Sequence, residues 1–248
     1  MGTLTESLPK GMLVVAGKTL IERQIEVLRR IGITEIVIVT GYKAEKIQYR
    51  GIRYYHNDRY ADTNMVETLM CAREEMTEDI LVAYSDIIYS PELASMVAAG
   101  SHQIGVAVDE AWRDYWQLRY GTTETDLESL TVAENGLITD IGRPVESSEG
   151  LAYRYIGLLK FSLQGTRNLL NIYNDRKNEG ACWRQSGKPF EKGYMTDLLY
   201  EAIASGLPVH PVVTRRGWFE FDTAADYEIC NLHYDGTGIV SELEKSEA

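Results

Sequence analysis

The segment Glu35–Gly41, "EIVIVTG", indicates which class of fold the chain adopts. Its β-branched run is typical of a strand buried on both faces. Residues 19–31, directly before it, repeat leucine and isoleucine at helical spacing, and Gly32 follows as a stop signal. A helix followed by a buried strand is the repeating unit of α/β proteins, so this stretch predicts a mostly parallel sheet.

The same alternation continues outward from this segment, with a change of rhythm in the middle of the chain. Asn135-Gly136 lies between two alternating runs and predicts a type I′ hairpin. Strands are expected at residues 51–57, 79–89, 104–110, 153–162, 209–215 and 218–223, and helices at 64–76, 91–99, 166–177, 194–205 and from 224. We therefore expect one domain over 1–248: a Rossmann-like α/β fold, mostly parallel, with helices on both faces and a small antiparallel hairpin insert.

Composition narrows the function classes. The 248 residues are 44% hydrophobic and 25% charged, and the formal net charge is −12. That charge disfavours a nucleic-acid partner, because binding to a phosphate backbone depends on clustered Lys and Arg. No run approaches the roughly 20 apolar residues of a membrane span. Cys71, Cys182 and Cys230 are too scattered for a disulfide framework or a Cys-x-x-Cys site. A cytoplasmic protein is expected.

Carboxylates near two strand ends are the first candidates for chemistry. Asp86 follows the apolar part of the strand expected at 79–89, and ligands of open α/β sheets bind at the carboxyl ends of strands. Glu220 and Asp222 are two residues apart and so share one strand face. Such oxygens suit Mg²⁺, which is held by one or two carboxylates plus substrate phosphates. The alternative is that Asp86 begins a turn and that the other two carboxylates lie on a solvated face.

Two further patterns allow a functional and a structural interpretation. Lys10 follows Pro9 in a loop and could present a point charge to phosphate, although most loop lysines are simply solvated. Trp112 and Trp116 share one helix face and, with Arg119 nearby, could form an aromatic box around a cationic or polar group. Core packing is the other interpretation. No Gly-x-Ser-x-Gly elbow, Walker loop or dinucleotide glycine fingerprint is present.

Several segments together resemble the sugar-phosphate nucleotidyltransferase family. The resemblance is carried in order, over essentially the whole chain, by residues 3–42 ("TLTESLPKGM…VTGY"), 60–72 ("YADTNMVETLMCA"), 84–89 ("YSDIIY") and 217–228 ("GWFEFDTAADYE"). The chain is most similar to the phosphocholine cytidylyltransferase-like branch, whose members activate phosphocholine, phosphonates or glutamine phosphate. "DEAWRDYWQLRY" and "YMTDLL" resemble the glutamine-phosphate type in particular.

The resemblance also bears on the N-terminus. Members of the family typically begin with a strand and a glycine-rich loop that ends in arginine, followed by a Leu/Thr stretch and Pro-Lys. This chain keeps that signature from Thr3 to Lys10. The resemblance implies that a strand and loop of about 15 to 20 residues would precede it. We expect a single nucleotidyltransferase domain that is N-terminally truncated relative to the family, either through a misplaced start codon, which we favour, or as a damaged enzyme.

The resemblance implies a mechanism that these residue types can perform. An oxygen of the acceptor phosphate attacks the α-phosphorus of CTP and pyrophosphate leaves. Because the second pKa of a phosphate is about 6, the acceptor is already anionic near neutral pH and requires no general base. By family position, Asp86 and Asp222 would hold Mg²⁺, with Glu220 as a possible auxiliary. Lys10 would neutralise phosphate charge.

Substrate contacts follow from the same resemblance. We expect contacts to the nucleotide from Thr63, Asn64 and Tyr42, and an acceptor pocket formed by Trp112, Trp116, Arg119, Tyr155 and Tyr194. The partners would be CTP and a small phosphorylated or phosphonate acceptor, and a homo-oligomer is possible. Two alternatives stay open. A metal-dependent glycosyltransferase would commonly carry Asp-x-Asp, whereas Asp86 precedes two isoleucines. An inactive truncated homologue would only bind a metabolite.

Overall fold

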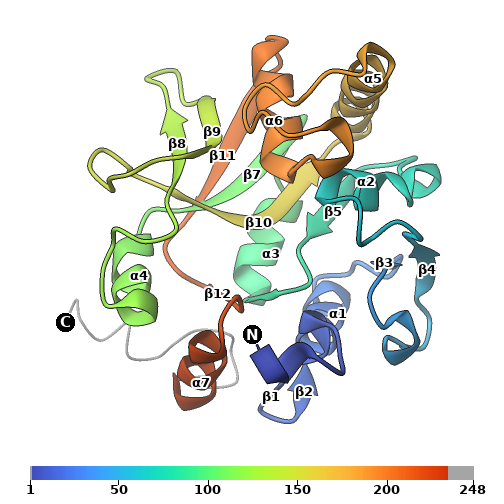
Figure 1. Ribbon diagram of the computed structural model, residues 1–248, viewed down its shortest axis with the longest axis vertical. Coiled ribbons are helices and arrows are strands. Elements are labelled where there is room, and N and C mark those ends of the chain that lie inside the picture. The colour runs from blue at the N-terminus through green and yellow to red at the C-terminus, as the bar shows by residue number, and fades with distance from the viewer. Residues whose placement is uncertain (1, 234–248) are drawn as a thin grey trace.

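A four-stranded sheet forms the centre of the protein (Figure 1). The computed structural model describes residues 2–233. The strand order is β11–β7–β10–β5, with bounds Val209–Thr214, Ile104–Asp109, Arg154–Phe161 and Ile80–Ala83. β11 runs parallel to β7, whereas β10 is antiparallel to both of its neighbours. The sheet is therefore less parallel than the alternating sequence pattern suggests.

Helices cover both faces of this sheet, as expected. α3 (Pro91–Ala98) packs on one face, and α5 (Leu163–Glu179) and α6 (Met195–Ala204) pack on the other. Successive side chains of a strand point to opposite faces. In β7, Ala107 accordingly joins the core cluster that contains α3, while Val106 and Val108 join the cluster that contains α5 and α6. The α/β class is confirmed.

The N-terminal third forms a smaller unit beside the sheet. α1 (Leu20–Arg30) begins where the Thr19 hydroxyl accepts a hydrogen bond from the Glu22 amide at 3.1 Å. The isoleucines of α1 share a core cluster with Ile36, Ile47 and Ile38 of β3 (Val37–Thr40), and β3 pairs in parallel with β4 (Arg53–His56). A short hairpin, β1 (Val14–Val15) and β2 (Lys18–Thr19), precedes it.

The strand expected over 79–89 is divided by a turn. β5 ends at Ala83, and a second strand, β6 (Ile87–Tyr89), pairs with β12 (Trp218–Glu220) rather than with the central sheet. The side-chain Nε2 of Gln24 donates to the carbonyl oxygens of Tyr84 at 2.7 Å and Ile87 at 2.6 Å. This clamp from α1 stabilises the turn, and Asp86 lies within it.

The expected hairpin insert is present, but with a different turn. β8 (Glu128–Val132) and β9 (Ile138–Pro144) are antiparallel, and β9 lies against α6. A type I′ turn requires positive φ at both central residues. Gly136 has φ +79°, but Asn135 is not among the residues with positive φ. Its side chain instead accepts a hydrogen bond from the Leu137 amide at 3.1 Å, so the type I′ prediction was wrong.

The remaining helices complete the described part of the chain. They are α2 (Met65–Met70), α4 (Trp112–Tyr120) and α7 (Ala224–His233), with 3₁₀ segments at Gly2–Thr5, Lys10–Met12, Ala44–Lys46, Arg73–Glu75 and Phe190–Lys192. The helix expected over 64–76 is thus split into α2 and a 3₁₀ turn. Within residues 2–233, no helix combines the length and apolar character that a membrane crossing needs.

Candidate active site

The pairing of β6 with β12 brings the two predicted metal-binding aspartates together. Asp86 directly precedes β6 and Asp222 follows β12, and these ends meet because the strands are antiparallel. The amide of Phe221 donates to the carbonyl oxygen of Asp86 at 2.9 Å, which extends the ladder to the level of both aspartates. Two residues 136 positions apart in the sequence thus share one end of a small sheet.

Lys10 lies between these two carboxylates. Its Nζ donates to Asp86 Oδ2 at 3.2 Å and to Asp222 Oδ1 at 2.9 Å. The side chains of Lys10, Asp86 and Asp222 are 36%, 25% and 36% exposed, so a ligand can reach them from solvent. The structure therefore assembles the predicted catalytic trio at an open position.

A close backbone approach places Lys10 there. Lys10 begins a 3₁₀ turn, and the next residue, Gly11, is buried. A Cβ atom at Gly11 would lie 2.7 Å from the Ile21 side chain and 3.1 Å from the Ser85 carbonyl oxygen. Both distances are shorter than ordinary contacts, so a side chain at position 11 would force Ile21 or the turn that carries Asp86 to shift.

Beneath the trio lies a buried arginine. Arg119, in the last turn of α4, has a fully buried side chain and donates from Nη1 to Glu220 Oε2 at 2.6 Å and from Nη2 to Asp222 Oδ2 at 3.2 Å. Glu220 and Asp222 do point to the same side, as their spacing predicts. Glu220, however, contacts Arg119 rather than Lys10, and its role as an auxiliary metal ligand stays a prediction.

Asp226 is a site residue that the sequence reasoning missed. Its fully buried carboxylate accepts from Arg119 Nε at 2.8 Å and Nη2 at 2.9 Å. It also accepts from the amides of Asp222 at 2.9 Å and Thr223 at 2.7 Å. Thr223-x-x-Asp226 has the form of a capping box at the start of α7. That signature was available in the sequence and would have identified Asp226 as an anchor for Asp222.

The electrostatics of the cluster favour a further cation. Lys10 and Arg119 carry two positive charges against the carboxylates of Asp86, Asp222, Glu220 and Asp226, so the formal sum with all groups ionised is about −2. Burial raises the pKa of Glu220 to about 8, with Asp222 and Asp86 adding to the shift against the pull of Arg119. Protonation of Glu220 near neutral pH thus removes part of the excess negative charge of the cluster.

The pKa values of the two half-buried aspartates, Asp86 and Asp222, are shifted in opposite directions. Burial raises the pKa of Asp86, and the neighbouring charge of Lys10 only partly offsets this. Burial also disfavours the charged form of Asp222, but the hydrogen bond and charge of Lys10, together with Arg119, outweigh it and lower the pKa of that carboxyl. Burial disfavours charged Lys10 as well, and its two carboxylate partners nevertheless raise its pKa.

The donor chemistry of this position fits Mg²⁺. Two carboxylates and an opening to solvent match an ion that binds one or two carboxylates and takes its other ligands from substrate phosphates and water. The bridging ammonium of Lys10 shows that a cation already lies between the two oxygens. Among residues 2–233, no group of three or more His, Cys, Asp or Glu side chains forms a protein-only metal cage.

The three residues expected to contact the nucleotide form hydrogen bonds within the protein. Asn64 caps α2, with Oδ1 accepting from the Met65 amide at 2.9 Å, and the Thr63 hydroxyl donates to the carbonyl oxygen of Arg59 at 2.9 Å. The exposed Tyr42 donates from its hydroxyl to the carbonyl oxygen of Glu6 at 2.6 Å. Their roles toward a nucleotide stay a prediction.

Three of the five acceptor-pocket candidates lie inside the core. Trp112 and Trp116 are on one helix face, as predicted, but both are fully buried and their rings meet edge to face at 5.8 Å. Arg119 is also buried, with its guanidinium 5.0 Å from the Trp116 ring centroid. The two tryptophans therefore pack in the core, as the structural interpretation expects, and the acceptor role of these three residues stays a prediction.

The other two acceptor candidates lie partly open. The Tyr155 hydroxyl donates to the Tyr84 hydroxyl at 3.1 Å, and Tyr84 is two residues before Asp86. Tyr194 precedes α6, where its amide donates to Asp197 Oδ2 at 2.9 Å, and the Lys188 ammonium lies 5.2 Å from its ring centroid. Tyr155 thus adjoins the turn that carries Asp86, whereas the direct contacts of Tyr194 are with the first turn of α6 and with Lys188.

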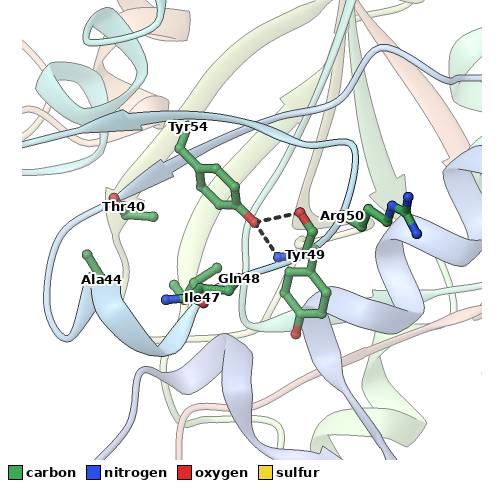
Figure 2. Close-up of a pocket in the computed structure, with 7 residues that line it drawn as sticks. All are labelled: Thr40, Ala44, Ile47, Gln48, Tyr49, Arg50 and Tyr54. Atoms are coloured by element: carbon green, nitrogen blue, oxygen red, sulfur yellow. Dashed lines mark hydrogen bonds between the residues drawn. The ribbon is translucent and has the colours of Figure 1, made fainter.

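A shallow cavity of about 410 Å³ lies apart from the carboxylate cluster, beside β3 and β4 (Figure 2). Thr40, Tyr49, Arg50 and Tyr54 are among its lining residues. The Tyr54 hydroxyl accepts from the Tyr49 amide at 2.6 Å. Its lining includes the charged Arg50 but no carboxylate.

Several known proteins are similar to this chain in sequence or fold. The chain is 29% identical to a CTP:phosphoglutamine cytidylyltransferase of Campylobacter jejuni over 237 residues, 91% of this chain and 92% of the relative. It is 36% identical over 90 residues, 35% and 39% of the two chains, to a choline-phosphate cytidylyltransferase of Streptococcus pneumoniae. A solved CTP:phosphocholine cytidylyltransferase from Streptococcus pneumoniae superposes with a TM-score of 0.71 at 23% identity, covering 94% of this chain and 92% of its own, which confirms the expected Rossmann-like fold. The family model for the MobA-like NTP transferase domain matches residues 1–221, and the chain belongs to that family.

Proposed function

We propose that the chain transfers CMP from CTP to a small phosphorylated acceptor, with Mg²⁺ as cofactor and glutamine phosphate as the acceptor. The observation that carries the proposal is the Lys10 ammonium held between Asp86 and Asp222 at an open strand end. Cationic and carboxylate groups at one point are what phosphoryl chemistry requires, because its catalysis consists mainly of positioning and charge neutralisation.

The residues of the cluster suit a reaction without a general base. The acceptor phosphate is largely ionised near neutral pH, so its oxygen can attack the α-phosphorus as it is. The bond between the α-phosphorus and the bridging oxygen breaks, and pyrophosphate carries the charge away. Lys10 binds that developing charge. Bound Mg²⁺ would supply a Lewis acid held by Asp86 and Asp222.

Arg119 acts as a positioning residue. It contacts Asp222 from the buried side while Lys10 contacts the other carboxylate oxygen. A carboxylate fixed from two directions has little rotational freedom, which lowers the cost of presenting it to a cation. Asp226 orients Arg119 in turn through two hydrogen bonds.

Two observations favour glutamine phosphate over phosphocholine. The similarity to the phosphoglutamine enzyme extends over 92% of that relative, against 39% for the choline-phosphate enzyme. Quaternary ammonium groups are typically bound in aromatic cages. The tryptophans that could have formed one, Trp112 and Trp116, are fully buried.

An acceptor panel tests the proposal. The chain is incubated with CTP, Mg²⁺ and glutamine phosphate, phosphocholine or 2-aminoethylphosphonate, and pyrophosphate and product mass are measured. We expect pyrophosphate in equal amount to a CMP-linked product, formed fastest with glutamine phosphate. Release of a nucleoside diphosphate from a nucleotide sugar would instead indicate a glycosyltransferase. CTP binding without pyrophosphate release would indicate a metabolite-binding protein.

A further inference from the structure

We propose that Lys10 is a built-in substitute for the divalent cation: in the free protein its ammonium occupies the metal position, and a metal ion enters by displacing it. The inference rests on the proposed function, because it concerns the same two aspartates. It adds that the free protein binds divalent ions weakly, and that metal and nucleotide enter together.

The position of the ammonium supports the first step. Nζ lies 2.9 Å from one oxygen of Asp222 and 3.2 Å from one oxygen of Asp86. Asp86 and Asp222 are also the carboxylates that would hold a divalent ion, and the ammonium already neutralises both of them. The ammonium and a divalent ion would therefore compete for one place, and their mutual repulsion in contact prevents joint occupancy.

Lys10 can leave this place, whereas Arg119 cannot. The Arg119 side chain is fully buried and bonded to Glu220, Asp222 and Asp226. Lys10 is 36% exposed and carries its charge on a flexible four-carbon stem at the start of a three-residue 3₁₀ turn. The cluster thus contains one fixed cation and one movable cation.

Displacement leaves the ammonium without its carboxylate partners. In the free protein only water would replace them, which disfavours metal binding. A nucleotide triphosphate offers the ammonium new anionic partners at the same edge, so its binding compensates for the loss. Metal and nucleotide would then strengthen each other's binding through Lys10, and this coupling is reciprocal.

Manganese titration of the free protein tests the proposal without CTP. Mn²⁺ replaces Mg²⁺ as the probe, and free Mn²⁺ is counted by its electron paramagnetic resonance signal. We expect Lys10→Met to bind Mn²⁺ at least about tenfold more tightly than wild type, equivalent to about 1.4 kcal/mol. Lys10→Arg keeps the charge and should bind as weakly as wild type. Lys18→Met breaks a different lysine–carboxylate pair, that with Glu26, and should leave the Mn²⁺ affinity at the wild-type value.

A second variant assigns the effect to this site. Adding Asp222→Asn to Lys10→Met should abolish the gain in Mn²⁺ affinity. Equal Mn²⁺ affinity in Lys10→Met and wild type would overturn the proposal, and so would a gain that survives Asp222→Asn. If Lys10→Met does not fold, Lys10→Gln is used, and Mn²⁺ should raise its Tm more than that of wild type; an equal rise overturns the proposal.

The two proposals can fail separately. A protein that releases no pyrophosphate from CTP could still show the gain in Mn²⁺ affinity, since the titration contains no nucleotide. Conversely, the protein could be an active cytidylyltransferase while its Lys10→Met variant binds Mn²⁺ no better than wild type. That result would contradict only the proposal that the metal ion displaces the Lys10 ammonium.

Discussion

Replacement of Arg119 by methionine tests whether the buried arginine holds the carboxylate cluster together. Its guanidinium lies 2.6 to 3.2 Å from oxygens of Glu220, Asp222 and Asp226. Methionine fills much of the space but leaves the fully buried Asp226 carboxylate without its cation. Removing one partner of a buried ion pair costs about 3–5 kcal/mol, so we expect the free energy of unfolding to fall by that amount.

Urea unfolding followed by tryptophan fluorescence measures this loss. Arg143→Met is the matched control: its pair with Asp140 spans 3.2 Å, but the arginine side chain is 57% exposed, and exposed pairs contribute at most about 1 kcal/mol. Combining Arg119→Met with Asp226→Asn removes the orphaned charge and should recover about 0.5–3 kcal/mol.

Two results would refute this reasoning. One is a decrease in the free energy of unfolding that is no larger for Arg119→Met than for Arg143→Met. The other is strict additivity of the Arg119 and Asp226 substitutions, which would mean that the two side chains do not interact energetically although Nε and Oδ1 lie 2.8 Å apart.

Two further predictions concern the approach of Lys10 and a remote histidine pair. Gly11→Ala should destabilise the protein by about 1–3 kcal/mol and slow pyrophosphate release, because its Cβ would lie 2.7 Å from Ile21. Gly105→Ala is the control, since the nearest atom to its Cβ would lie 3.5 Å away. Equal effects of the two substitutions would contradict the argument. Burial and the His102 ring, stacked at 3.7 Å, lower the pKa of His210. The folded state therefore favours neutral His210. The free energy of unfolding should be at its full value above about pH 6.5, and it should decrease below that pH as the unfolded state takes up the proton first. Urea titrations from pH 8 to 5 should show this decrease, and a decrease of equal size in His210→Gln would exclude His210 as its cause.

Local patterns predicted the framework well. Helical spacing and Gly32 located α1, and the β-branched run located β3, because these signals depend only on neighbours in the sequence. The rule that ligands meet strand ends selected Asp86, and residue spacing placed Glu220 and Asp222 on one side.

The missed features depend on contacts between distant segments. The turn after Ala83 is stabilised by Gln24, 60 positions before Tyr84 in the sequence, and no local pattern encodes that clamp. The inward turn of the Trp112 and Trp116 face follows from packing of α4 on the core, which helical spacing leaves open. The convergence of Lys10 with Asp222, 212 positions apart, came from the family resemblance rather than from local signals.

The most direct test of the central claim is pyrophosphate release from CTP and glutamine phosphate by Asp86→Asn and Asp222→Asn. We predict a loss of at least about 100-fold for each, with little change in Tm, because each removes a charge at the reacting phosphates while the buried Arg119–Asp226 pair remains. Asp114→Asn, which breaks an exposed pair with Arg216, should keep the wild-type rate. A folded Asp86 or Asp222 variant that keeps the rate within about threefold of wild type would contradict the claim that nucleotidyl transfer occurs at this cluster.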